Sequence, residues 1–255
     1  MPPPASSSWT ALLRPAPHAR RRLVVFPHAG AGPDSYASLL TRLPDDVEVL
    51  GVTLPGRERR PDEAPGTSPD AVAHGVAGEL AERAPLPTVY FGHSLGALLA
   101  VATARARPGL CDGLVVSAAF PGSRAHPFPD LLESTEGLAA ILARHRLPAD
   151  ALTAPGPLSG RERLLAHDLE LTRRALVSVA GTCLPVPLTA LAGTDDPIVP
   201  AATLPLWGGF TSGGFRCRLV EGGHYFPFLP AGRRALLAEI ADALTAAPAY
   251  QATGT

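Results

Sequence analysis

The sequence predicts an α/β protein with a mostly parallel sheet flanked by helices, and three observations predict it. Short apolar runs alternate along the chain with longer stretches of helical periodicity. Most of these runs lack polar alternation, as is typical of strands that are covered on both faces. One run, residues 88–91, leads through a glycine-flanked turn directly into a helical segment. With 255 residues, 46% of them hydrophobic, the chain can bury one large core, so we expect a single domain over residues 1–255.

Six apolar runs are predicted to be strands, and helices are predicted around them. The strands are expected at residues 23–26, 48–52, 88–91, 113–117, 187–191 and 215–220. The helices are expected at residues 34–42, 68–83, 95–106 and 231–246. The Pro- and Ser-rich residues 1–8 and the residues 247–255 are expected to be loose tails.

An excursion of about 70 residues separates the strand at 113–117 from the strand at 187–191, which is too long for an ordinary crossover. Helical periodicity returns within it at 134–144 and 159–180, on either side of a Pro- and Ala-rich stretch at 148–157. We interpret the insertion, about 120–185, as a helical lid, because it falls on the carboxyl side of the strands, where ligands bind. The alternative is that these helices only pad the sheet.

Charge and composition exclude several classes of partner. The net charge of −1 provides no polyanion-binding surface, so nucleic acid is not expected as a partner. The chain starts without a basic segment followed by an apolar core, and no apolar run approaches membrane-spanning length. We therefore expect a cytoplasmic protein without membrane contact. Three cysteines without metal-like spacing are expected to be reduced thiols, and no metal is expected: Cys111, Cys183 and Cys217.

The G-x-S-x-G segment at residues 92–96 is the most informative motif of the chain. A strand that turns sharply into a helix here forces Ser94 into a strained conformation, and the flanking glycines avoid a Cβ clash across the turn. The Ser94 hydroxyl is then exposed at the carboxyl edge of the sheet. The next amide, that of Leu95, lies at a helix N-terminus and can bind an oxyanion.

A serine nucleophile needs a histidine base and a carboxylate that orients it, in the chain order Ser, acid, His. Asp196 follows the strand at 187–191 and precedes a proline, so we assign it as the acid; Asp195 is the competing candidate. His224 follows the last predicted strand and two glycines, which is where the base should lie. The other seven histidines are interpreted as structural or surface residues, and His93 is expected to point away from the reacting face.

A second oxyanion donor should come from the loop after an early strand. Residues 26–32, Phe-Pro-His-Ala-Gly-Ala-Gly, provide small residues that let the backbone approach a carbonyl. The amides of Ala29 and Leu95 are the expected pair. The loop is not a phosphate-binding loop, because no G-K-[ST] follows.

Together these segments resemble the type II thioesterases, free-standing editing hydrolases of polyketide and nonribosomal peptide pathways within the α/β-hydrolase superfamily. The resemblance covers nearly everything from about Leu23 to Leu244. It depends on Pro-His-Ala-Gly at 27–30, Leu-Pro-Gly-Arg at 54–57, the serine motif, Gly-Thr-Asp-Asp at 193–196 and Gly-Gly-His-Tyr-Phe at 222–226.

The resemblance implies an α/β-hydrolase fold with a helical lid and no cofactor. The substrate it implies is an acyl group on the phosphopantetheine arm of an acyl or peptidyl carrier protein, from which aberrant or stalled units are removed. Ser94, Asp196 and His224 match the family's catalytic triad, and Ala29 and Leu95 match its oxyanion hole. A monomer is expected.

The chain departs from the family pattern in the insertion and in one loop. Relatives often carry Arg-Ala-Asp where this chain has Ala166-His167-Asp168, and an aromatic residue where Val179 stands. The run Gly30-Ala31-Gly32 varies the family's glycine pair. These departures leave the preferred acyl chain open.

Three arginines, Arg57, Arg59 and Arg60, follow the strand at 48–52 at the same edge of the sheet. They can face the phosphate or an acidic carrier protein. Alternatively they form structural ion pairs with Glu58, Asp62 and Glu63, which we favour for Arg57.

Two rival functions remain open from the sequence. A carboxylesterase or lipase acting on small oxygen esters would use the same triad. A hydrolase-fold binding protein without catalysis is the other rival, but all three triad residue types are present.

Overall fold

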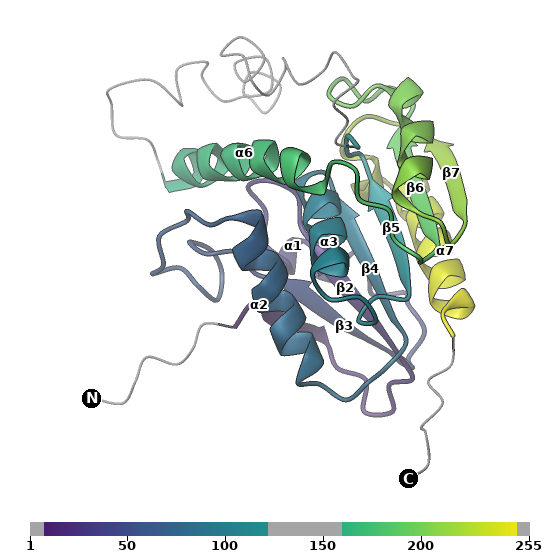
Figure 1. Cartoon of the computed structure of the whole chain (residues 1–255), viewed down its shortest axis with the longest axis horizontal. Helices are drawn as coiled ribbons and strands as arrows, with labels where there is room; N and C mark the ends of the chain where they lie inside the picture. The colour runs from purple at the N-terminus through teal and green to yellow at the C-terminus, as the bar shows by residue number, and fades with distance from the viewer. Residues whose placement is uncertain (1–7, 122–159, 249–255) are drawn as a thin grey trace.

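The computed structural model describes residues 8–121 and 160–248, and all strands of this part belong to one sheet (Figure 1). The strand order is β1-β3-β2-β4-β5-β6-β7. Among the described strands, β1 alone pairs antiparallel with its neighbour. The strands are β1 (Thr10–Arg14), β2 (Arg21–Phe26), β3 (Val47–Val52), β4 (Thr88–His93), β5 (Gly113–Ser117), β6 (Leu188–Gly193) and β7 (Phe215–Val220).

Helices cover both faces of this sheet, as Figure 1 shows. The helices α2 (Pro69–Ala81), α3 (Leu95–Ala106) and α6 (Gly160–Val179) pack on one face, whose core includes Val24. The helices α1 (Asp34–Ala37) and α7 (Pro230–Ala246) pack on the other, whose core includes Leu23. Neighbouring residues of β2 thus enter opposite cores, which explains its continuous apolar sequence. The predicted fold class is confirmed.

The predicted elements agree with the structure to within a few residues, with one exception. β5, β7 and α3 have the expected bounds, and the expected helix at 159–180 is α6. The expected helix at 34–42 is helical only over Asp34–Ala37; turns follow, closed by short-range hydrogen bonds such as Leu40 N to Ala37 O at 3.3 Å. The expected segments at 134–144 and 148–157, and most of both tails, lie outside the described residues.

Three described elements were not expected from the sequence: β1, the 3₁₀ helix η1 (Ala201–Phe210) and the short 3₁₀ helix η2 (Phe226–Phe228). β1 depends on a distant carboxylate on α2. Glu79 accepts hydrogen bonds from the amides of Trp9 at 2.5 Å and Thr10 at 2.9 Å. The Trp9 ring lies where a Cβ at Gly75 would be, and the Arg60 guanidinium lies 4.1 Å from its centroid. This short strand is therefore stabilised by tertiary contacts that its own sequence does not reveal.

β7 differs from the expected burial of strands on both faces. Its residues 216–219 are exposed, because β7 is the edge strand of the sheet. Arg216 and Arg218 instead form exposed ion pairs with Glu239 of α7.

The parallel strands bring four loops to one edge of the sheet. β2, β4, β6 and β7 all run in the same direction, so the loops after them share the carboxyl edge. These loops carry Ala29, Ser94, Asp196 and His224, respectively. Among the described residues, no helix has the length and apolarity needed to cross a membrane.

Candidate active site

Ser94 lies at a strained turn between β4 and α3. Its φ of 55° and ψ of −121° are unfavourable for a residue with a side chain. Two close approaches explain the flanking glycines: a Cβ at Gly92 would overlap the backbone of Gly96, and a Cβ at Gly96 would overlap the carbonyl of Phe26. The Ser94 amide donates to Ser117 O at 2.8 Å, which ties the turn to the end of β5.

His224 and Asp196 are brought together from two loops. His224 Nδ1 lies 2.8 Å from Asp196 Oδ2, and the two side chains are 5% and 0% exposed. The other carboxylate oxygen of Asp196 accepts the amides of Ile198 at 2.8 Å and Val199 at 3.0 Å. This network fixes the carboxylate and orients the imidazole.

The neighbouring Asp195 has a different role. Its side chain is exposed and accepts a hydrogen bond from Thr194 Oγ1 at 2.9 Å, while its amide donates to Gly222 O at 3.0 Å. At the end of β6, a Cβ at Gly193 would overlap Gly222 O, so this glycine lets the two loops meet. Asp196, not Asp195, is the carboxylate that contacts His224.

The residue before the serine, His93, contacts the His224–Asp196 pair. The rings of His93 and His224 have centroids 5.3 Å apart. Ser94 follows His93 directly and is partly exposed, and within the described part of the chain its hydroxyl makes no hydrogen bond. The structure therefore pairs His224 with Asp196 and places Ser94 at the same edge of the sheet, without a hydrogen bond to His224.

His93 is a packing residue, as expected, and its ring contacts that of the candidate base. Its ring is fully buried, its Nδ1 is hydrogen-bonded to Ser117 Oγ at 3.1 Å, and it contacts the rings of both His224 and His28. Burial is the main reason that the pKa of His93 is well below its usual value, and the nearby His224 and His28 lower it further. His93 is therefore a neutral packing residue, but it packs against the candidate base.

The loop after β2, which carries Ala29, is held on both sides of that residue. On one side, the His28 amide donates to Tyr36 Oη at 3.3 Å, and His28 Nδ1 lies 2.6 Å from the same oxygen. Burial raises the pKa of Tyr36 well above its usual value, so the phenol stays protonated. On the other side, the Gly30 amide donates to Asp168 Oδ2 at 2.6 Å.

Arg57 and Asp168 form a buried ion pair that the sequence did not predict. The guanidinium donates to both carboxylate oxygens at 2.7 Å, and the side chains are 5% and 1% exposed. Ion pairing was expected for Arg57, but with Glu58, Asp62 or Glu63 rather than with a residue of α6. The available signal was the Ala166-His167-Asp168 run, where the resemblance implied Arg-Ala-Asp in relatives.

The two other arginines of this loop differ in exposure. Arg60 is buried, pairs with Glu63 at 2.7 Å and stacks on Trp9, so it cannot face a partner. Arg59 is about half exposed and pairs with Asp34 at 2.9 Å. Of the three arginines, Arg59 is the one whose charge reaches the surface.

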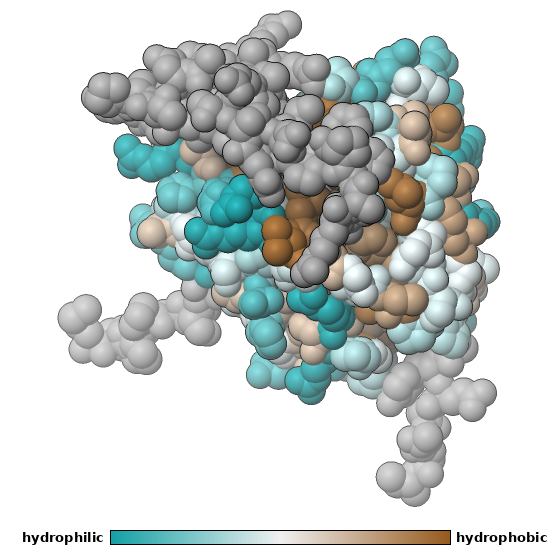
Figure 2. Space-filling view, turned by 45° about the horizontal axis from the view of Figure 1, so that its top comes forward, coloured by the Kyte–Doolittle hydropathy of each residue, from teal (hydrophilic) through white to brown (hydrophobic). Residues whose placement is uncertain are grey.

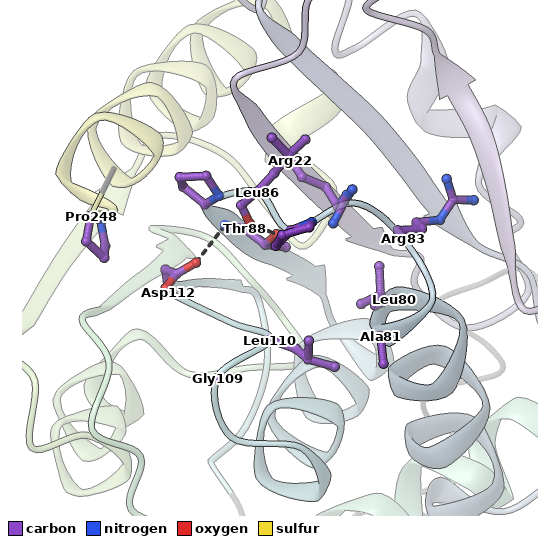
Figure 3. Close-up of a pocket in the computed structure, with 12 residues that line it drawn as sticks. Arg22, Leu80, Ala81, Arg83, Leu86, Thr88, Gly109, Leu110, Asp112 and Pro248 are labelled. Carbon is purple, nitrogen blue, oxygen red and sulfur yellow. Dashed lines mark hydrogen bonds between the residues drawn. The ribbon is translucent and has the colours of Figure 1, made fainter. Parts of the chain in front are cut away.

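A separate cavity of about 430 Å³ lies at the opposite, amino edge of the sheet (Figure 3). Arg22 at the start of β2, Thr88 at the start of β4 and Asp112 before β5 line it, and Asp112 Oδ2 accepts the Thr88 amide at 2.8 Å. It contains none of the candidate residues described above.

The three cysteines are free, with Cys111 buried and Cys183 and Cys217 exposed.

The sheet and this edge define the class of protein. A strained serine after a central parallel strand, with a buried Asp–His pair in the loops after later strands, is the arrangement of α/β hydrolases. Residues 21–244 match the family model described as thioesterase domain, and the chain belongs to this family. It is therefore a thioester hydrolase.

Individual relatives agree with this membership. Thioesterase PikA5 of Streptomyces venezuelae is 33% identical over 87% of this chain and 80% of its own length. The RedJ thioesterase of the prodiginine pathway in Streptomyces coelicolor superposes with a TM-score of 0.72, at 31% identity over 90% of this chain and 92% of its own. The type II thioesterase BorB of the borrelidin cluster has the same TM-score, at 30% identity over 94% and 98%. The resemblance to type II thioesterases is confirmed, which favours this function over that of a general carboxylesterase or lipase.

Proposed function

We propose that the chain hydrolyses acyl groups from the phosphopantetheine arm of carrier proteins, with Ser94 as nucleophile, His224 as base and Asp196 as its orienting carboxylate. The observation that carries this proposal is the buried His224–Asp196 hydrogen bond, which lies at the same sheet edge as the strained Ser94. The amides of Ala29 and Leu95 are the proposed oxyanion donors.

The hydrogen bond to Asp196 determines which nitrogen of His224 acts as the base. Because the Asp196 carboxylate accepts the proton of Nδ1, the neutral ring carries its free lone pair on Nε2. That nitrogen takes the Ser94 proton as the hydroxyl attacks the thioester carbonyl. The carboxylate then stabilises the imidazolium that forms.

The two half-reactions use the same groups. In the first, the C–S bond breaks, the pantetheine thiol leaves with the proton of His224, and the acyl group stays on Ser94 as an ester. In the second, His224 takes a proton from water, the hydroxide attacks the ester carbonyl, and the free acid leaves as Ser94 regains its proton. In both steps the oxyanion forms against the amides of Ala29 and Leu95.

Two surface features support an acyl substrate on a carrier. Apolar side chains reach the surface next to His224, where Tyr225, Phe228 and Leu229 are 37%, 38% and 53% exposed. Apolar surface also gathers among hydrophilic side chains on the face that Figure 2 turns toward the viewer. Such surface suits an acyl chain, and the exposed charge of Arg59 suits the phosphate or an acidic carrier. The names of two relatives place them in the prodiginine biosynthetic pathway and the borrelidin biosynthetic cluster. We infer that this chain removes aberrant or stalled acyl units in polyketide or nonribosomal peptide biosynthesis.

Replacement of the serine tests the proposal. Ser94→Ala should abolish hydrolysis of an acylated carrier protein and labelling by a fluorophosphonate, while thermal unfolding stays that of the wild type. The wild type should hydrolyse the acylated carrier with a higher kcat/KM than a nitrophenyl ester of the same acyl group. Retained turnover in Ser94→Ala contradicts the assignment of the nucleophile, and a preference for the oxygen ester contradicts the substrate class.

A further inference from the structure

Three segments far apart in the chain meet at the buried ion pair of Arg57 and Asp168. Arg57 follows β3, and Asp168 lies in α6, 111 residues further along the chain. Two parallel hydrogen bonds of 2.7 Å fix both side chains in one plane. The third segment is the oxyanion loop, defined here as residues 27–33 after β2.

The pair binds the oxyanion loop at two consecutive residues. Asp168 Oδ2 accepts the Gly30 amide at 2.6 Å, and Arg57 Nη1 donates to Ala31 O at 3.0 Å. Gly30 has a φ of 78°, a conformation that favours glycine. A Cβ at that position would lie 3.5 Å from Leu165 of α6, so the loop runs directly beneath this helix.

These bonds hold the peptide groups on both sides of the Ala29 amide. The Gly30 amide is held by Asp168, and the His28 amide is held by Tyr36. The Ala29 N–H lies between these two fixed peptide groups, and among the described residues it donates no hydrogen bond. An unpaired amide whose neighbours are fixed is a preorganised donor.

We propose that Arg57 and Asp168 are positioning residues that orient the Ala29 amide toward the oxyanion, so that transition-state binding depends on α6. The inference rests on the proposed function, because it needs an oxyanion at Ala29. Structural stability alone explains the pair poorly, since a buried ion pair often contributes no more than apolar residues of the same volume.

A positioning role and a structural role predict different kinetics. An interaction that is made only in the transition state lowers kcat when it is lost, and leaves ground-state binding unchanged. A structural role lowers the amount of folded enzyme or the unfolding temperature, and the enzyme that stays folded keeps its kcat.

The experiment compares Asp168→Asn with the double variant R57M/D168L. The asparagine keeps an oxygen that can accept the Gly30 amide but loses the charge that holds Arg57. The double variant removes both charges together and with them the acceptor, so it leaves no buried charge unpaired and keeps the test open if Asp168→Asn folds poorly. Glu48→Gln is the matched control, because the Arg22–Glu48 pair is also buried, with side chains 5% and 15% exposed, but lies toward the amino edge of the sheet.

Three quantities are measured on folded protein: kcat and KM with a small acyl thioester, and the affinity for a trifluoromethyl ketone analogue. The Ser94 oxygen adds to the ketone carbonyl, whose oxygen becomes an oxyanion, so affinity for the ketone reports oxyanion binding. The corresponding methylene thioether does not react, so its affinity reports ground-state binding. We expect kcat to fall about 10- to 100-fold in Asp168→Asn and further in the double variant, with KM within about threefold of the wild type. Affinity for the ketone should fall in parallel with kcat and that for the thioether should not, and Glu48→Gln should keep the wild-type kcat.

Two outcomes overturn the positioning role without touching the proposed function. One is a wild-type kcat in the folded variants, and the other is an equal loss of affinity for the ketone and the thioether. A wild-type enzyme that neither hydrolyses thioesters nor reacts with a fluorophosphonate overturns the proposed function, and the positioning role with it.

Discussion

At the residue scale, the candidate site depends on which of two adjacent aspartates contacts the base. Asp196 is buried, with one oxygen on His224 and the other on two backbone amides. Asp195 is exposed and bonds locally. A proline after Asp196 and the order of the residues indicated the assignment from the sequence. The burial that makes the difference is a tertiary property.

Substitution of each aspartate by asparagine separates their roles. Asp196→Asn should lower kcat by on the order of 10⁴, because an amide can hold the imidazole in the wrong tautomer. Asp195→Asn is the matched control and should leave kcat at the wild-type value. A large loss in Asp195→Asn, or none in Asp196→Asn, would reverse the assignment of the acid. Steady-state kinetics with a small thioester measures both.

At the element scale, apolar pattern predicted the buried strands well and the peripheral elements poorly. β4, β5 and β6 are buried along their whole length, so their sequences are continuous apolar runs. β1 has no such run; its place depends on the carboxylate of Glu79, 69 residues away from Thr10. A strand held by a distant side chain has no local signal that a sequence pattern can detect.

Removal of that carboxylate should therefore destabilise β1 while leaving the chemistry intact. Glu79→Ala leaves the amides of Trp9 and Thr10 without their acceptor, and we expect it to lower the free energy of unfolding by about 1–3 kcal/mol. Urea unfolding measures the loss, and kcat should stay that of the wild type. Glu82→Ala, an exposed residue at the end of the same helix, is the control and should have little effect on stability. Equal losses in the two variants would show that β1 does not depend on Glu79.

At the scale of the whole molecule, the cluster around His93 joins the loop after β2, the end of β4 and the loop after β7. The rings of His28, His93 and His224 meet there, and His93 is fully buried. A fold that keeps an imidazole neutral becomes less stable as the pH falls, because the unfolded chain binds a proton that the folded chain does not.

The sign of this effect follows from the direction of the shift. The folded pKa of His93 lies well below the unfolded value of about 6.5, so its contribution is intact above that pH and is lost as the pH falls below it. We expect wild-type stability to fall by up to about 1.4 kcal/mol more per pH unit below pH 6.5 than that of His93→Gln, which cannot titrate. Urea unfolding between pH 5 and 7.5 measures the difference. Parallel curves for the two proteins would show that His93 is protonated in the folded state.

The sequence by itself determined the fold class, the buried strands and the candidate residues Ser94, Asp196 and His224. These depend on local patterns: apolar runs, a glycine-flanked serine, and polar residues directly after strands. Only the tertiary structure decided which residues meet, such as Asp168 with Arg57 across 111 residues, or His93 with His224. The physical reason is that strand and turn preferences act between near neighbours in the chain, whereas partners of buried charges and rings are selected when distant elements pack together.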